Sequence, residues 1–439
     1  METSTKKIGL WTSTSLVIGN MIGAGVFLMP SALATYGGIS LLGWIFSAAG
    51  ALFLAMLFGR LSKMMPTGDG GPYAYTRKGF GDFPGFLVAW GYWISCWTTN
   101  ATIAVSLVGA LSLFIPILGL NPVAAVLTAL GAVWGLTWVN ALGVKEGGKV
   151  QLVTTMLKLI PLTLVAFGGL FFIDFNNFLP FNISGLSDFA AISATAAMTI
   201  FAFQGVECAT IPAGEVKNPE TTIARATMIG TLITIVVYIL STVSVMGIIP
   251  AAELQKSVTP FADAAEKVWG EGARYWVGAG VVISAFGALN GWILIQGQVP
   301  FAIAKDKLFP HIFEKKNERG APAFGIVISS VLISILVFMN YTKGLVEQFQ
   351  FLVLLTTVMV LVPYLFSSAS YLMLLIEKKH LNTGGWIRAI ILTAGGFTFS
   401  IWAIAGSGEE SVYWGFLMLL AGVPFYMWNI WKRKSVEHE

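Results

Sequence analysis

Long apolar runs separated by short polar loops dominate the pattern along this chain. A helix needs roughly 20 mostly apolar residues to cross the hydrocarbon core of a bilayer, and these runs lack the apolar/polar alternation of barrel strands. The pattern therefore predicts an all-α integral membrane protein of about twelve transmembrane helices. The predicted spans are 9–35, 39–64, 84–115, 122–143, 149–173, 187–213, 222–249, 275–303, 322–340, 347–376, 386–407 and 411–431.

Basic residues gather in alternate loops. With a cytoplasmic N-terminus, 21 of the 26 Lys and Arg residues fall on the cytoplasmic side, and only Lys256, Lys267, Arg274 and Lys343 fall on the other side. Translocated loops avoid Lys and Arg, so the sequence predicts a multi-pass protein of the inner membrane with both termini cytoplasmic.

Composition excludes two other classes of protein. Hydrophobic residues make up 56% of the chain and charged residues 11%, which leaves too little polar surface for a soluble globule. The net charge of +4 follows from the loops, and no basic cluster has the pattern of a nucleic-acid-binding module. Cys96 and Cys208 lie in apolar segments of different predicted helices, which favours two packed thiols over a disulfide.

Two of the predicted spans contain helix-breaking residues. The first has Gly19, Gly23 and Gly25 within seven residues, and the sixth has Gly205 followed by Pro212. Non-helical backbone at membrane depth persists only where the protein or a cavity satisfies its polar groups, so an unwound segment in either span would mark such a place. The alternative interpretation is that the glycines allow two helices to pack closely.

The two breaks lie five spans apart, as an inverted repeat would place them. They predict an N-terminal repeat over 1–173, a second repeat over 187–376 and peripheral helices over 386–439, with a substrate site where the breaks meet.

Two ionisable residues fall well inside predicted spans, away from their ends: Lys158 in the fifth and Glu207 in the sixth. Charged groups in hydrocarbon are costly, so each is a candidate for coupling or gating, and a purely structural pair is the alternative. Polar and aromatic side chains also line up on helical faces: Tyr92, Cys96, Asn100 and Ile103 follow a spacing of 4, 4 and 3 residues. We expect such stripes to line a water-accessible vestibule.

Several motifs resemble one transporter superfamily. They are GNMIGAGVFLMP at 19–30, GGPYAY at 70–75, YWISCWTTN at 92–100, GVECATIPAGEVKNP at 205–219, NGW at 290–292 and VPYLF at 362–366. The chain resembles the amino acid/polyamine/organocation transporters over essentially its whole length. Within them it is similar to the basic amino acid/polyamine antiporters, typified by arginine/agmatine, lysine/cadaverine and putrescine/ornithine exchangers. The resemblance implies a LeuT-like five-plus-five inverted repeat with discontinuous helices 1 and 6.

The resemblance also implies a substrate site. It assigns the substrate's carboxylate and amino group to the segment Asn20, Met21, Gly23, Ala24 and Gly25. It assigns the opposing broken segment to Phe201, Ala202 and Gln204, and the surroundings of the substrate side chain to Cys96, Asn100, Ile103, Trp292 and Thr356. Tyr92, Glu207 and Tyr364 match gating positions.

Three departures from the arginine/agmatine exchanger affect the expected substrate. Ala24 replaces a serine, and Phe201 replaces a tryptophan, which weakens a cation–π clamp on a guanidinium by about 0.5–2 kcal/mol. Lys158 stands where that exchanger is apolar and resembles the lysine that takes the place of a sodium ion in other members. Sodium dependence is therefore not expected.

We therefore expect a secondary-active transporter that exchanges an amino acid for an amino acid or its amine without sodium. A proton-coupled permease for neutral or broad-range amino acids is the alternative. We expect no cofactor, no bound metal and no enzymatic activity. His311, His380 and His438 all lie in predicted loops or the tail, so no predicted span contains a histidine that could act as a metal ligand or general base. The expected partners are an amino acid or polyamine, the bilayer and candidate coupling protons, and a homodimer stays open.

Overall fold

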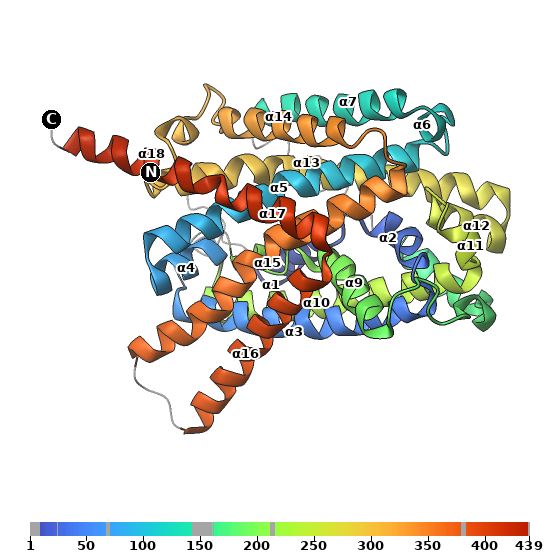
Figure 1. Cartoon of the computed structure of the whole chain (residues 1–439), viewed down its shortest axis with the longest axis horizontal. Coiled ribbons are helices and arrows are strands. Elements are labelled where there is room, and N and C mark those ends of the chain that lie inside the picture. The colour runs from blue at the N-terminus through green and yellow to red at the C-terminus, as the bar shows by residue number, and fades with distance from the viewer. Residues whose placement is uncertain are drawn as a thin grey trace.

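The computed structural model describes residues 9–23, 25–66, 71–142, 160, 162–210, 216–378 and 383–437, with backbone alone from 432 onward. Every regular element within these ranges is a helix, and most of the long helices run roughly along the longest axis of the molecule, while others cross it obliquely (Figure 1). The predicted all-α fold class is confirmed.

Most predicted spans correspond to observed helices. The helices are α1 (Leu10–Met21) with α2 (Gly25–Ala34), α3 (Ser40–Met64), α5 (Asp82–Leu111), α7 (Pro122–Ala141), α9 (Asp188–Ile200), α10 (Pro219–Ile248), α13 (Glu271–Lys305), α14 (Ala323–Met339), α15 (Leu345–Lys378), α16 (Thr383–Gly406), and α17 (Glu409–Leu420) with α18 (Gly422–Glu437).

The described part of the chain has nine helical segments that are long and apolar enough to cross a membrane. The α1 and α2 pair forms a tenth, bent by 42°. α14 has 17 residues, the lower limit for a crossing. Much of the predicted fifth span lies outside the described residues, and its last part is a helix that ends in the 3₁₀ turn η2 (Gly169–Phe172).

Short helices occupy segments that the sequence analysis treated as loops. They are α4 (Pro72–Phe80), α6 (Ile117–Leu120), α11 (Ala251–Leu254) and α12 (Pro260–Trp269), together with 3₁₀ turns η1 (Gly37–Ile39), η3 (Phe175–Phe178) and η7 (His311–Glu314). Pro72 and Pro260 begin the two longer ones, in agreement with the preference of proline for the first helical turn.

α4 is fixed to the end of α13 by a polar cluster. Tyr73 donates a 2.8 Å hydrogen bond to the Asp306 carboxylate, and Arg77 lies 3.5 Å from the same group and 2.8 Å from Asp82. Burial and then the Asp306 carboxylate raise the pKa of Tyr73, which keeps this hydroxyl a neutral donor. The 71–82 segment therefore closes over one end of the bundle.

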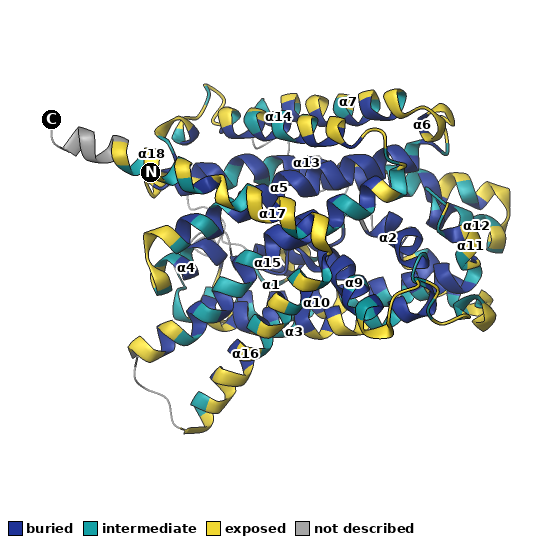
Figure 2. Ribbon diagram, viewed as in Figure 1, coloured by how far each residue is buried: buried dark blue, intermediate teal, exposed yellow. Residues whose placement is uncertain are grey.

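α5 is the central helix of the molecule. Its most apolar 18-residue stretch is 94% buried, and it packs against α13, α15, α14 and α7. Figure 2 shows α5 and α13 largely buried, whereas α7 and α14 expose their outer faces. α5 is thus rigidly placed to present side chains toward the interior.

Helices of the two predicted repeats pack against each other. α3, from the first repeat, lies against α9 and α10, and α1 also packs on α10. Gly43 on α3 permits the α9 contact, because a Cβ there would lie 2.8 Å from the carbonyl carbon of Thr195. The predicted repeats are interleaved in space.

We predict that Gly43→Ala destabilises the protein by about 1–3 kcal/mol, because the added methyl group overpacks the α3/α9 contact. The control is Gly131→Ala in α7, where a Cβ would meet nothing within 4 Å and the gain in helix propensity is about 0.5–1 kcal/mol. The measurement is the unfolding midpoint of each purified variant in detergent. Equal midpoints for the two variants would show that the close contact carries no energy.

Candidate functional site

The first break lies between α1 and α2. α1 ends at Met21, and the next residue, Ile22, leaves helical geometry with ψ of 83°. The Met21 carbonyl accepts two hydrogen bonds, from the Gly23 N–H at 2.8 Å and from the Tyr238 hydroxyl at 2.6 Å. The carbonyl freed by the end of the helix is thereby satisfied within the protein, as membrane depth requires.

The second break lies after α9. The helix gives way at Phe201 to a 3₁₀ turn, η4 (Phe201–Phe203), then to extended backbone at Gln204 with ψ of 130°. Gly205 follows with φ of +107°, a conformation that strongly favours glycine, and the chain continues into η5 (Cys208–Thr210). The predicted unwinding of the sixth span is observed.

The two breaks touch. A Cβ on Gly205 would lie 3.2 Å from the backbone carbon of Asn20 and 3.2 Å from the backbone nitrogen of Met21. A side chain at this position would press on the first break, and the positive φ of Gly205 disfavours any other residue as well, so two separate constraints favour glycine here. This contact brings together backbone groups that are about 185 positions apart in the sequence.

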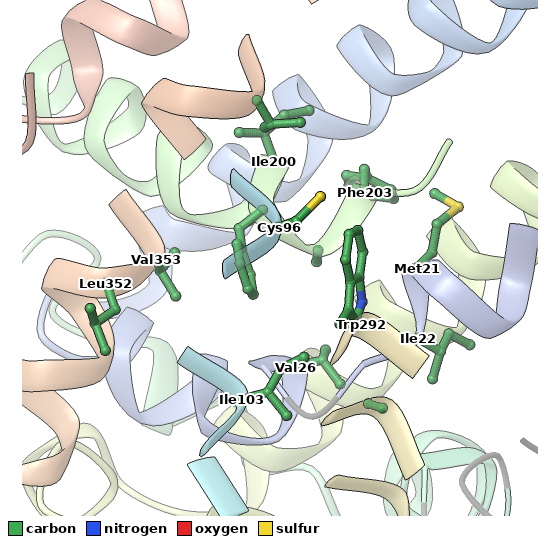
Figure 3. Close-up of a cluster of buried hydrophobic side chains, with 14 of the residues drawn as sticks. Met21, Ile22, Val26, Cys96, Ile103, Ile200, Phe203, Trp292, Leu352 and Val353 are labelled. Atoms are coloured by element: carbon green, nitrogen blue, oxygen red, sulfur yellow. The ribbon is translucent and has the colours of Figure 1, made fainter. Parts of the chain in front are cut away.

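A narrow cavity of about 20 Å³ lies between the breaks, α5, α10 and α13. Figure 3 shows Trp292 in a cluster of buried side chains that includes Met21, Cys96, Val26 and Ile103. The cavity is lined by Asn20, Met21, Gly23, Val26, Thr99, Ile103, Phe201, Ala202, Gln204, Tyr238 and Trp292. Its volume suffices for about one water molecule and is far below the ~300–1,000 Å³ of ligand pockets, so the structure is closed around this point.

The structure brings together eight of the thirteen residues predicted to bind substrate. They are Asn20, Met21, Gly23, Ile103, Phe201, Ala202, Gln204 and Trp292. Ala24 lies outside the described residues, and Gly25 begins α2 immediately after the break. Cys96, Asn100 and Thr356 are buried but do not line the cavity.

Asn100 is engaged elsewhere. Its amide donates a 2.7 Å hydrogen bond to Gln296 on α13, and the Gln296 amide donates to Ser330 on α14 at 3.0 Å. Ser330 is in turn 2.6 Å from the Thr137 hydroxyl on α7. Asn100 therefore belongs to a buried network that joins four helices one turn away from Trp292.

Three cavity residues were not predicted: Val26, Thr99 and Tyr238. The Thr99 hydroxyl donates a 3.0 Å hydrogen bond to the side-chain amide oxygen of Gln204 and so links α5 to the second break. Tyr238 is fully buried in α10 and holds the first break. A lone tyrosine inside an apolar span was a usable signal for Tyr238, but nothing in the sequence distinguished Thr99 from its neighbours.

The three predicted gating residues meet at one carboxyl group. Glu207 is fully buried and accepts hydrogen bonds from the hydroxyls of Tyr92 at 2.8 Å and Tyr364 at 2.5 Å. The Gly205 N–H donates to it at 3.2 Å. Glu207 therefore links α5, α15 and the second break, while Lys158, the other predicted ionisable group, lies outside the described residues.

Among the described residues, no group of three or more His, Cys, Asp or Glu side chains is arranged so that it could hold a metal ion.

Sequence comparison places this geometry in a known group. The model of the family described as "Amino acid permease" matches residues 8–427. The chain belongs to this amino acid permease family.

Curated relatives of this permease match over nearly their full length. The arginine/ornithine antiporter of Pseudomonas aeruginosa is 31% identical over 97% of this chain and 91% of its own. The cadaverine/lysine antiporter of Escherichia coli K12 is 31% identical over 98% and 97%. The putrescine transporter of Haemophilus influenzae is 31% identical over 97% and 98%. The permease is thus a multi-pass membrane protein, and the predicted superfamily and its LeuT-like fold are confirmed.

We predict that Gly205→Ala lowers substrate transport at least about tenfold, because the methyl group strains the positive φ and separates the two breaks. Gly185→Ala is the matched control: Gly185 also has a positive φ, +75°, but nothing lies within 4 Å of its Cβ position. Uptake into proteoliposomes and the unfolding midpoint are measured for both variants. Similar uptake by the two variants would refute a role for the contact between the breaks.

Proposed function

We propose that this permease is a secondary-active exchanger of the inner membrane that swaps an amino acid for an amino acid or its amine without sodium. The observation that carries the proposal is the closed cavity where two unwound segments meet, in a chain whose near-full-length relatives are named antiporters. We propose transport rather than enzymatic chemistry as the activity. The substrates named for those relatives, basic amino acids and diamines, are the first to test.

In this proposal, backbone N–H and C=O groups at the two breaks bind the carboxylate and amino group of the substrate. The cavity wall contains the ends of α1 and α9, and unwound backbone at membrane depth offers N–H donors to a carboxylate and carbonyl acceptors to an ammonium group. Apart from the hydroxyl of Tyr238, the described lining has no titratable side chain. The rings of Phe201 and Trp292 would contact the substrate side chain through van der Waals and cation–π interactions.

The predicted site residues that do not line the cavity are also assigned roles in this proposal. Cys96, Asn100 and Thr356 lie outside the closed cavity and would approach the substrate only after the cavity widens. Ala24 and Gly25 extend the first break, and Lys158 would occupy the position of a sodium ion, which is the basis for sodium independence.

Transport requires the cavity to enlarge, because its present volume excludes an amino acid. The repeats 1–173 and 187–376 would rock around the breaks, with 386–439 peripheral and both termini cytoplasmic by the positive-inside rule. A homodimer remains a prediction.

The test of the function is counterflow. Proteoliposomes are loaded with one compound from a panel of basic amino acids, their amines and neutral amino acids, and uptake of labelled arginine, lysine or ornithine is measured without sodium. Exchange predicts that internal substrate raises the initial uptake at least about tenfold over empty vesicles. If a proton gradient drives uptake into empty vesicles as fast as internal substrate does, the protein is a proton-coupled permease and not an exchanger.

Glu207 supports a test of proton involvement. Protonation of Glu207 would turn one of its two accepting oxygens into a donor and make both weaker acceptors, which would loosen the link among α5, α15 and the second break. We predict that exchange by the wild type is faster at pH 5 than at pH 8 and that Glu207→Gln removes this difference, because glutamine cannot change charge.

Uptake is measured from pH 5 to 8, and Glu207→Asp, which retains the acid, is the control that should keep part of the pH dependence. If Glu207→Gln keeps the wild-type profile, this carboxyl does not carry the proton, and its role is structural.

A further inference from the structure

A second and larger cavity lies on the outer side of the helix bundle. It has a volume of about 610 Å³ and lies between α5, α14, η7 and the α17/α18 pair. It shares no lining residue with the cavity at the breaks. Its walls include Trp90 and Trp93 of α5, Leu332 and Met339 of α14, and Phe425 and Trp428 of α18. We call this cavity the lateral groove.

The lateral groove is long and apolar. Its α14 wall runs from Phe324 to Met339, about 22 Å along the helix at 1.5 Å per residue. Met339 is 66% exposed and Trp428 is 48% exposed, so the groove opens at the outer surface of the helix bundle. Its length exceeds half of the ~30 Å hydrocarbon core, which suits an extended acyl chain.

The η7 end of the lateral groove is basic. Pro310, Ile312 and Phe313 line the groove, Lys315 and Lys316 follow Phe313 after the single residue Glu314, and Arg319 comes shortly after. These three basic side chains are exposed. Three residues of extended chain reach at most about 11 Å, so Lys316 stays close to the groove wall formed by Phe313.

The acidic groups at this end are engaged by neighbours. Asp306 accepts from Tyr73 and pairs with Arg77, and Glu314 lies 2.9 Å from the ring of His311. The next carboxylate along the chain, Glu318, is outnumbered by the basic residues around it. This end therefore keeps an excess of positive charge.

Two further contacts bring additional positive charge to the η7 end of the lateral groove. The ammonium groups of Lys305 and Lys316 both lie 4.8 Å from the centroid of the Phe301 ring, which holds two cations near one another. α18 also returns to this end, because Asn429 donates a 3.2 Å hydrogen bond to the Lys307 carbonyl. The sequence of α18 continues past Trp428 into Lys432, Arg433 and Lys434.

We propose that the lateral groove binds an anionic phospholipid of the bilayer, with an acyl chain along α14 and the phosphate at Lys315, Lys316 and Arg319. Charge complementarity selects this occupant: basic pockets at the cytoplasmic ends of membrane helices suit anionic headgroups, and charge-assisted bonds to phosphate are stronger than neutral ones. A zwitterionic phospholipid would fill the groove equally well but would leave the positive charge uncompensated.

The experiment measures retained lipid by native mass spectrometry of the purified full-length chain. The protein is mixed with equal amounts of phosphatidylglycerol and phosphatidylethanolamine, and the apparent Kd of each is determined. We expect at least tenfold tighter binding of phosphatidylglycerol. Lys315→Gln/Lys316→Gln/Arg319→Gln should abolish that preference, and Leu332→Trp, which fills the groove, should weaken both lipids.

Lys63→Gln/Lys217→Gln/Arg225→Gln is the matched control. It removes three exposed basic residues at α3 and α10, away from the lateral groove, and should leave the preference for phosphatidylglycerol unchanged. Equal affinity of the wild type for the two lipids would overturn the proposal. So would an equal loss of preference in the two triple variants, which would indicate attraction by overall charge alone. Unfolding midpoints in neutral lipid verify that each variant is folded.

Discussion

The need to satisfy unwound backbone inside a membrane governs the centre of this permease. No water is available at that depth to replace lost helix hydrogen bonds, so each freed group must find a partner in the protein. The Met21 carbonyl meets this need through Gly23 and Tyr238, and the Gly205 N–H meets it through Glu207. Tyr238 and Glu207 are therefore as important to the breaks as the glycines that permit them.

These satisfied breaks depend in turn on rigid surroundings. α5 supplies Tyr92 to Glu207 and Thr99 to Gln204, so one buried helix contacts both ends of the second break. The network from Asn100 through Gln296 holds α5 against α13 and keeps Trp292 beside the cavity. The wall of the cavity thus combines a fixed side, made of α5 and α13, with two segments whose geometry is irregular.

The sequence predicted the parts of this structure that depend on local composition. Apolar runs marked the spans, and the glycines near position 23 and at Gly205 marked the breaks, because glycine density and membrane depth both act locally. The diversion of Asn100 to Gln296 was not predictable, since a stripe on one helix does not reveal which neighbour it meets. Tyr238 did carry a usable signal, a tyrosine inside an apolar span, but its partner could not be predicted because the Met21 carbonyl lies 217 residues away in the chain. The short helices α4 and α12 were missed because their low apolar content is typical of loops.

The narrowness of the cavity at the breaks has a kinetic consequence. A substrate cannot diffuse through an opening that holds one water molecule, so each turnover must first move apart the residues that line it, among them Phe201, Trp292 and Tyr238. Motions of this kind take microseconds to milliseconds, far longer than the passage of a solute along an open pore. The turnover rate is therefore limited by how fast the walls of the cavity separate, and not by how fast the substrate arrives.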